Sequence, residues 1–173
     1  MKNKIFIAIF ATAILFTSSC KKLLTFEISD STTTTINIIG LPIGLFDIPT
    51  PPITTNSEEE FAQNDTKVEL VKEIILKQLD LTITSPSDKT FSFLKSIEIY
   101  ISADGEDETK LAWNNDVESS AKSIELNCTS EALDRYVKKE KYKLRTKVTT
   151  KETLFNKVDI KIDFKFQVTA DPL

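Results

Sequence analysis

Two long stretches near the end of the chain alternate between apolar and polar residues. In residues 142–148 and again in residues 158–168, the mainly apolar side chains occupy the even-numbered positions. Successive side chains of a strand point to opposite faces, so a period of two predicts strands with one face in the core and one in water. A polar turn near Lys151 separates the two stretches. The pattern therefore predicts a half-buried antiparallel hairpin whose outward face carries charges of both signs.

The same alternation occurs earlier in the chain. Residues 74–84 and residues 97–101 each alternate over most of their length. The Asp-Gly pair at 104–105 is a strong turn signal and predicts that residues 110–113 return as a hairpin partner. Residues 123–128 are expected to form a further strand.

The region before residue 57 combines β-branched residues with prolines. Residues 26–39 are rich in threonine and isoleucine, which favours a first extended segment. Four prolines follow in residues 40–52, and because proline lacks a backbone donor, this stretch is expected to be an edge strand or a loop.

Two short helices are expected. Ser57 followed by Glu60 has the form of a capping box and predicts a helix over residues 57–64. Thr129 or Ser130 is expected to cap a second helix that runs through Lys138.

Seven to eight strands with one or two short helices predict an all-β fold. The expected architecture is an antiparallel β-sandwich of immunoglobulin-like kind, in one domain over residues 26–173.

The N-terminus has the pattern of an export signal. Lys2 and Lys4 precede an uncharged apolar run over residues 5–16, and small residues then lead to Cys20. This arrangement resembles a bacterial lipoprotein signal with its lipobox at residues 16–20. We expect residues 1–19 to be a signal peptide, Cys20 to carry the lipid, and residues 20–25 to be a tether.

Lipidation implies a membrane as partner without a spanning segment, because several acyl chains suffice to hold a domain at a bilayer. Loss of Lys2 and Lys4 with the leader changes the side-chain charge from -4 to -6. Cys128 then remains without an intramolecular disulfide partner, and we expect it to pack in the core.

Composition narrows the classes of function. The 173 residues include no histidine, which excludes catalysis by an imidazole base and metal sites with histidine ligands. The chain has only 3 glycines and no glycine-rich nucleotide-binding motif. The mildly acidic balance, with a pI near 5.0, disfavours nucleic acid as a partner. We therefore expect no enzyme activity, no cofactor and no metal. The acidic turn over residues 103–108 is expected to be a solvated hairpin tip, with weak calcium binding as an alternative.

The best candidate contact surface is the apolar stretch of residues 36–53, in which Asp47 is the only charge. Buried, this stretch closes an edge of the sandwich; exposed, it forms a patch that marks a partner, glycan or membrane contact. Trp113, beside the 104–105 turn, is a second candidate because its ring can stack on a sugar or plug the core. The candidate contact residues are Leu41, Ile43, Leu45, Phe46 and Trp113.

Residues 53–105, together with the C-terminal alternating stretches, resemble a family of small lipoproteins common in Bacteroidota. The resemblance implies a β-sandwich of LEA14-like or immunoglobulin-like topology and brings no catalytic residue. In that phylum, transfer to the cell surface goes with acidic residues just after the lipidated cysteine. Lys21 and Lys22 stand there instead, which implies a periplasm-facing anchor in the outer membrane, with the cell surface as the alternative.

Three hypotheses of function remain. The leading one is a non-enzymatic, lipid-anchored β-sandwich of the cell envelope that acts as a binding or protein-interaction module, with an envelope protein or a glycan as its partner. The second is a lipoprotein that binds carbohydrate or lipid through residues 36–53 or Trp113. The third is a hydrolase that uses carboxylates alone, which requires two carboxyl groups that converge in a cleft.

Overall fold

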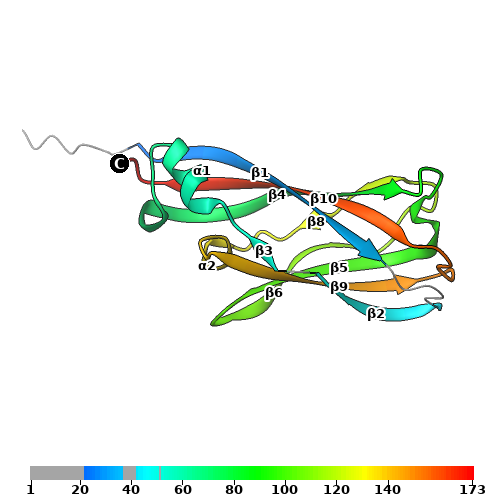
Figure 1. Cartoon of the computed structure of the whole chain (residues 1–173). Helices are drawn as coiled ribbons and strands as arrows, with labels where there is room; N and C mark the ends of the chain where they lie inside the picture. Colours follow the sequence, from blue (N-terminus) through cyan, green and yellow to red (C-terminus); the bar gives the residue numbers. More distant parts are fainter. Residues whose placement is uncertain (1–21, 37–41, 51) are drawn as a thin grey trace, which may run out of the picture.

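The strands of the protein form two facing antiparallel sheets, seen in a computed structural model that describes residues 22–36, 42–50 and 52–173 (Figure 1). The strands are β1 (Leu24–Ile36), β2 (Gly44–Pro49), β3 (Ile53–Thr54), β4 (Val71–Ser85), β5 (Leu94–Ala103), β6 (Glu106–Asn114), β7 (Ser123–Glu125), β8 (Asn127–Cys128), β9 (Lys141–Thr150) and β10 (Val158–Ala170). The helices are α1 (Ser57–Gln63) and α2 (Asp134–Val137), with 3-10 turns at Val68–Leu70 and Phe91–Phe93. The expected all-β antiparallel sandwich is confirmed.

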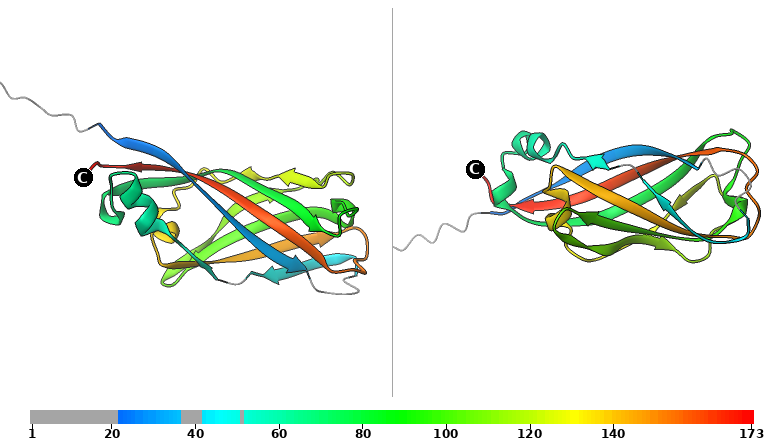
Figure 2. Two further views of the ribbon diagram at one scale, coloured as in Figure 1. Left: turned by 45° about the horizontal axis from the view of Figure 1, so that its top comes forward. Right: turned by 60° about the horizontal axis from the view of Figure 1, so that its bottom comes forward.

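The four-stranded sheet has the order β1-β10-β4-β7, and the six-stranded sheet has the order β2-β9-β5-β6-β8, with β3 also paired to β9. β1 and β10 pair without a register shift over their whole length, from Leu24 opposite Ala170 to Ile36 opposite Val158. Figure 2 shows the two layers from two further sides. The helices α1 and α2 lie at the same end of the sandwich as the start of β1 (Figure 1).

The core fills the space between the sheets with the apolar faces of the alternating strands. In β10 every second residue from Val158 to Ala170 is buried, as the period of two predicts. The largest fully buried side chains are Tyr136, Phe61, Phe91, Phe93, Ile74, Leu76, Leu79, Leu81, Ile83, Ile99 and Ile101.

The expected C-terminal hairpin is wrong in its pairing. β9 pairs with β2 and β5 in one sheet, whereas β10 pairs with β1 and β4 in the other. Each strand has one buried face, as expected, but these faces meet across the core. Alternation predicts which face of a strand is buried, but it does not determine which strands pair with it. The connection over residues 151–157 can therefore cross from one sheet to the other.

The hairpin around the Asp-Gly pair is confirmed. β5 pairs with β6, and Ala103 lies opposite Glu106 across the turn. Gly105 has a φ of 81°, a conformation that a residue with a Cβ atom rarely adopts.

The first helix begins at Ser57, as expected, but the expected cap is wrong, and so is the expected start of the second helix. Asn56 stands at the N-cap position of α1 without a side-chain hydrogen bond, and Ser57 is the first helical residue. The Ser57 hydroxyl is within hydrogen-bond distance of the Thr55 hydroxyl, at 3.2 Å, instead of capping the helix. The second helix begins only at Asp134, because the Thr129 hydroxyl accepts a local bond from the Glu131 N–H and forms a turn there.

Residues 123–128, expected as one strand, divide between the two sheets. β7 pairs with β4 of the four-stranded sheet, and β8 pairs with β6 of the six-stranded sheet. Leu126 lies between them, 3% exposed, and its N–H donates to the Leu79 carbonyl at 2.9 Å. This side of the sandwich, where one segment hydrogen-bonds to both sheets, is called the closed side below.

Cys128 lies at the closed side and is half-buried against the core. Burial, the largest effect, raises the pKa of its thiol, which keeps the sulfur protonated and unreactive at neutral pH. Its Sγ lies 3.6 Å from the Leu126 carbonyl, in position to donate a weak hydrogen bond. The expected packing role of Cys128 matches this partly buried position.

Within the described ranges, none of the helices has the length and apolar run needed to cross a bilayer.

Candidate functional site

The side of the sandwich opposite the closed side is bordered by β1 and β2, the edge strands of the two sheets. In the described part of the chain, β1 pairs only with β10 and makes no backbone hydrogen bond across this gap. Three hollows follow β1 here, between residues 28–36 on one wall and residues 48–50 and 52–57 on the other, with contributions from the core and from α1. We call this row of hollows the open groove.

The inward-facing positions of β1 change character along the strand. At its two ends Phe26, Ile28 and Ile36 pack against the core. Between them the inward positions carry Asp30, Thr32 and Thr34, none of which is buried. Because inward positions of a sandwich strand are normally apolar, these polar side chains indicate that the interior here is open to solvent or to a ligand. The middle of β1 therefore forms one wall of the groove.

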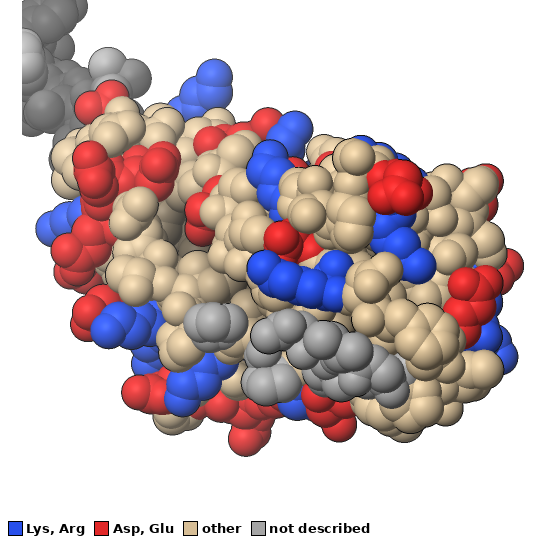
Figure 3. Space-filling model, turned by 45° about the vertical axis from the view of Figure 1, so that its right-hand side comes forward, with Lys and Arg blue, Asp and Glu red and all other residues tan. Residues whose placement is uncertain are grey.

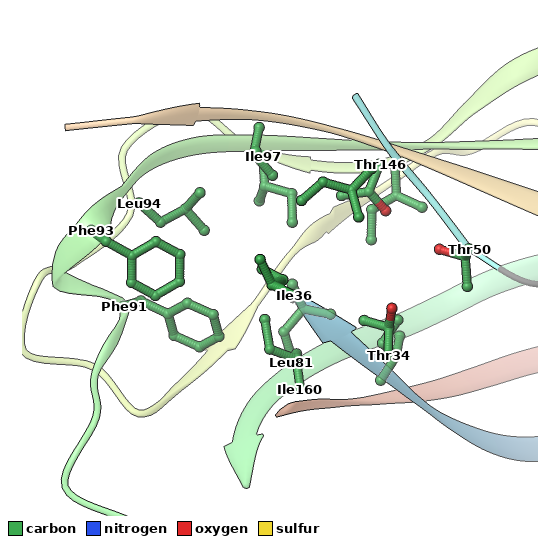
Figure 4. A pocket seen from close by; sticks show the side chains of 14 residues that line it. Thr34, Ile36, Thr50, Leu81, Phe91, Phe93, Leu94, Ile97, Thr146 and Ile160 are labelled. Atoms are coloured by element: carbon green, nitrogen blue, oxygen red, sulfur yellow. The ribbon is translucent and has the colours of Figure 1, made fainter. Parts of the chain in front are cut away.

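The first hollow is a cavity of about 30 Å³ between the sheets, which we call the intersheet cavity (Figure 4). Phe91, Phe93 and Leu94 line one end of it, and the threonine hydroxyls lie toward the other end (Figure 4). The full lining comprises Thr34, Ile36, Ile48, Thr50, Leu81, Phe91, Phe93, Leu94, Ile97, Ile99, Thr146, Val148, Ile160 and Ile162. The cavity is thus almost entirely apolar, with hydroxyl groups at one end.

Thr50 carries an unusual polar group in this cavity. The residue is 9% exposed, and its Oγ1 has no hydrogen-bond partner in the described part of the chain. Its backbone N–H donates to the Leu144 carbonyl at 3.2 Å, which fixes the residue against β9. A buried hydroxyl without a partner costs about 1–3 kcal/mol, so this atom is poised to bind a group that enters the cavity.

The second hollow, the α1 hollow, has a volume of about 90 Å³ and lies between β1, the start of β9 and the start of α1. Its lining comprises Ile28, Ser29, Asp30, Thr55, Asn56, Ser57, Glu60, Val137, Tyr142 and Phe166. Among these described residues there are two carboxylates and no lysine or arginine. The α1 hollow therefore favours a cationic group.

Tyr142 lines the α1 hollow with a second buried hydroxyl. The residue is 2% exposed, and its OH bonds to no group in the described ranges. Burial raises the pKa of Tyr142, and the negative charge of Asp30 raises it further. The hydroxyl is thus a neutral donor at physiological pH, beside a carboxylate.

Between these two hollows lies the third, a depression of about 320 Å³, which we call the middle depression. Its lining is mainly polar, with hydroxyls from both walls, and Pro52 and Ile53 add an apolar part. The lining residues are Asp30, Ser31, Thr32, Thr33, Thr50, Pro52, Ile53 and Thr54. The middle depression joins the apolar end of the groove to the acidic end.

The apolar stretch of residues 36–53 is partly buried and partly exposed. Ile36 and Ile48 are buried, and Phe46 is half-buried against the core. Ile43 and Leu45 are exposed, at 66% and 60%. β2 is an edge strand, as expected, so the stretch closes an edge with one face and presents apolar side chains with the other. Cys20 and Leu41 lie outside the described residues.

The structure does not bring Trp113 together with these residues. Trp113 lies on β6, and both β9 and β5 separate it from β2. Lys110 Nζ stands 5.9 Å from the Trp113 ring centre and 5.8 Å from that of Tyr100, and the Arg145 guanidinium lies 4.4 Å from Tyr100. Both aromatic rings thus already have a cation within 6 Å.

These cations belong to a set of ion pairs on the outer face of the six-stranded sheet. Arg145 bonds both Glu108 and Asp47, and Lys110 bonds Glu98. The hydrogen bond from Lys110 lowers the pKa of Glu98, and the bond from Arg145 lowers the pKa of Glu108. These ion pairs bring charges of both signs to the outer face. On the different side of the molecule drawn in Figure 3, basic and acidic side chains are likewise interspersed.

In the described part of the chain, no three acidic or cysteine side chains are grouped so that they could hold a metal ion.

The sequence patterns did not identify Thr50 or Tyr142. Thr50 stands among prolines and looks like a loop residue, and Tyr142 looks like an ordinary core position of an alternating strand. One signal was present: within residues 26–36 the alternation is apolar at both ends and polar in the middle. That break marks the wall of the groove.

No family model and no curated protein matches the chain. Among solved structures, the chain is similar to one whose title reads Desmodium yellow mottle tymovirus, at 12% sequence identity and a TM-score of 0.25. The match covers 87% of this chain and 90% of that chain. At this TM-score the likeness indicates neither fold nor function.

Proposed function

We propose that this protein is a non-enzymatic, lipid-anchored binding module of the bacterial cell envelope, and that it binds its partner in the open groove. The anchor is the expected lipid on Cys20, in the outer membrane and facing the periplasm. The support for the anchor is the leader pattern of residues 1–20, and the support for the binding site is the geometry of the groove.

One observation carries the binding proposal. Two buried side-chain hydroxyls lack a partner in the described ranges, Thr50 Oγ1 and Tyr142 OH, and both line the open groove. Buried polar groups are nearly always hydrogen-bonded, so an exception calls for a ligand or an ordered water. Two exceptions in one groove, at its apolar end and at its acidic end, favour a ligand that spans it.

The binding proposal is tested on the lipidated protein, extracted from envelope membranes in mild detergent and measured by native mass spectrometry. We expect a bound molecule on the wild-type protein and its loss from a Thr50→Val/Tyr142→Phe double variant, which removes both hydroxyls at nearly constant volume. Trp113→Ala is the matched control and retains the molecule. Loss from Trp113→Ala with retention by the double variant overturns the proposal and moves the site to the outer face.

The anchor is tested separately with Cys20→Ala. Without the cysteine thiol there is no group to lipidate, so we expect an unprocessed protein with no acyl mass. An unchanged mature N-terminus with no loss of acyl mass in the variant contradicts the anchor and leaves the groove untouched.

A further inference from the structure

We propose that the partner is an extended polypeptide segment that adds to the free edge of β1 as an antiparallel strand. Every second side chain of this segment enters the open groove, in the order apolar, small polar, basic from its N-terminus. This inference rests on the proposed binding function and names the chemistry of the partner.

The edge of β1 is suited to strand addition. β1 is 13 residues long and pairs with β10 without a register shift, so its other edge presents a continuous row of backbone donors and acceptors. An extended peptide placed there forms main-chain hydrogen bonds that do not depend on its sequence, while its alternate side chains supply specificity. Within the described ranges no other strand occupies this edge.

The spacing of the hollows matches the repeat of a strand. On β1, the intersheet cavity is lined by Thr34 and Ile36, the middle depression by residues 30–33, and the α1 hollow by residues 28–30. The inward positions among them lie two residues apart, from Ile36 back to Ile28. Side chains on one face of an added strand recur every two residues, at about 6.6–6.8 Å, and so point into the three hollows in turn.

The residues that line each hollow indicate which side chain of the added strand it would accept. The intersheet cavity is apolar and small, which fits the end of a leucine or valine side chain, and Thr50 Oγ1 lies beside it for a polar group of the entering segment. The middle depression is lined with hydroxyls and fits serine or threonine. In the α1 hollow Asp30 and Glu60 attract a lysine or arginine. The Tyr142 hydroxyl, which has no partner in the described part of the chain, is left to donate to a carbonyl of the segment.

The direction of the added strand and the choice of partner follow from the same residues. All strand pairs of the four-stranded sheet are antiparallel, and antiparallel pairs are slightly more stable per residue. A second copy of β1 is disfavoured, because an inward-facing charge on an edge strand opposes pairing between like edges, and Asp30 is such a charge. A basic segment turns the same charge into an attraction.

The test uses the lipidated protein in detergent and a synthetic peptide, acetyl-Thr-Thr-Leu-Thr-Ser-Thr-Lys-Thr-Thr-amide. Its control exchanges the leucine and the lysine. Isothermal titration calorimetry is expected to show binding of the first peptide and affinity at least about tenfold lower for the control, because leucine burial and the charge pair are both lost. Equal or stronger binding of the control overturns the proposed order of side chains.

Two further measurements test the register. Asp30→Asn is expected to weaken binding of the first peptide by about two- to fivefold, whereas Glu27→Gln, an equal change of charge on the outward face of β1, leaves binding unchanged. Hydrogen exchange by mass spectrometry is expected to show slower exchange within residues 24–36 when the peptide is bound. Binding that leaves exchange in β1 unchanged overturns strand addition.

The failure of this inference can be separated from failure of the proposed function. A small sugar or lipid that the double variant loses, together with no peptide binding, supports the groove as a binding site and overturns the polypeptide partner. A concentration-dependent dimer that protects β1, with no competition by the peptide, also overturns it, in favour of a second copy.

Discussion

The two lateral sides of this sandwich are built differently. On the closed side, β7 and β8 hydrogen-bond to opposite sheets within six residues, and Leu126 fills the gap between them. On the open side, β1 and β2 border a groove with polar residues on its inner wall and two buried hydroxyls that have no partner among the described residues. In the part of the chain that the structure describes, the buried side-chain hydroxyls without a partner line the open side, as expected of a binding surface.

The largest expected effect comes from truncating leucine on the two sides. Leu126→Ala leaves a cavity where the two sheets are joined, and we expect the free energy of unfolding to fall by about 2–5 kcal/mol. Leu45→Ala on the open side, with the side chain 60% exposed, is expected to change it by less than about 0.5 kcal/mol. Urea denaturation measures both. Equal losses in the two variants contradict the division into a closed and an open side.

The next largest effect is expected from removing the hydroxyl of two buried tyrosines, Tyr136 and Tyr142. Tyr136 is fully buried, and its OH donates to the Asp107 carbonyl at 2.6 Å, so Tyr136→Phe is expected to lower the free energy of unfolding by about 1–2 kcal/mol. Tyr142→Phe removes a buried OH that bonds to no described group and is expected to be neutral or stabilising. Chemical denaturation of the ligand-free protein checks the pair. A loss for Tyr142→Phe as large as that for Tyr136→Phe shows that the Tyr142 hydroxyl is already satisfied within the protein.

The smallest effect is a dependence on alkaline pH. Burial raises the pKa of Tyr142 in the folded protein above its ordinary value of about 10, so the unfolded chain releases this proton first. The contribution to stability is therefore complete below pH about 10 and is lost as the pH rises above it, by up to about 1.4 kcal/mol per pH unit. The difference in the free energy of unfolding between wild type and Tyr142→Phe, measured from pH 9 to 11, is expected to show this fall. Parallel curves contradict a buried, neutral Tyr142.

Local patterns predicted the strands well, because the rule that generates them is local. The alternation in residues 97–101 and the turn at the Asp-Gly pair 104–105 both depend on residues that are close together in the chain. These two signals were sufficient to predict the β5-β6 hairpin. The long strands β4, β9 and β10 were predicted for the same reason.

Pairing and caps were predicted poorly, because each depends on residues distant in the chain. β9 and β10 are consecutive strands with matching patterns, but the partners that fit their buried faces lie in different sheets. Ser57 had the expected spacing from Glu60, but it is buried next to Thr55, whose hydroxyl bonds the Lys139 carbonyl. The bond from the Thr55 hydroxyl to the Lys139 carbonyl joins residues 84 positions apart, so a capping pattern of four consecutive residues cannot predict it.

The candidate site was only partly visible in the patterns. The stretch of residues 36–53 was singled out, and its residues Ile36 and Ile48 do line the intersheet cavity. Ile43 and Leu45 are exposed on β2, and Trp113 lies on another strand of the six-stranded sheet. The acidic half of the groove was missed, because Asp30, Glu60 and Tyr142 come from three separate segments that meet only in the folded chain.

Periodicity and turn chemistry were sufficient for the class of fold and for which face of each long strand is buried, since both depend on neighbours a few residues apart. The folded chain alone decided which strands pair, which side of the sandwich is the closed side, and that Thr50 and Tyr142 have no side-chain partner within the described ranges. The physical reason is that a buried hydroxyl has or lacks a partner according to what packs around it, and that packing depends on groups far along the chain.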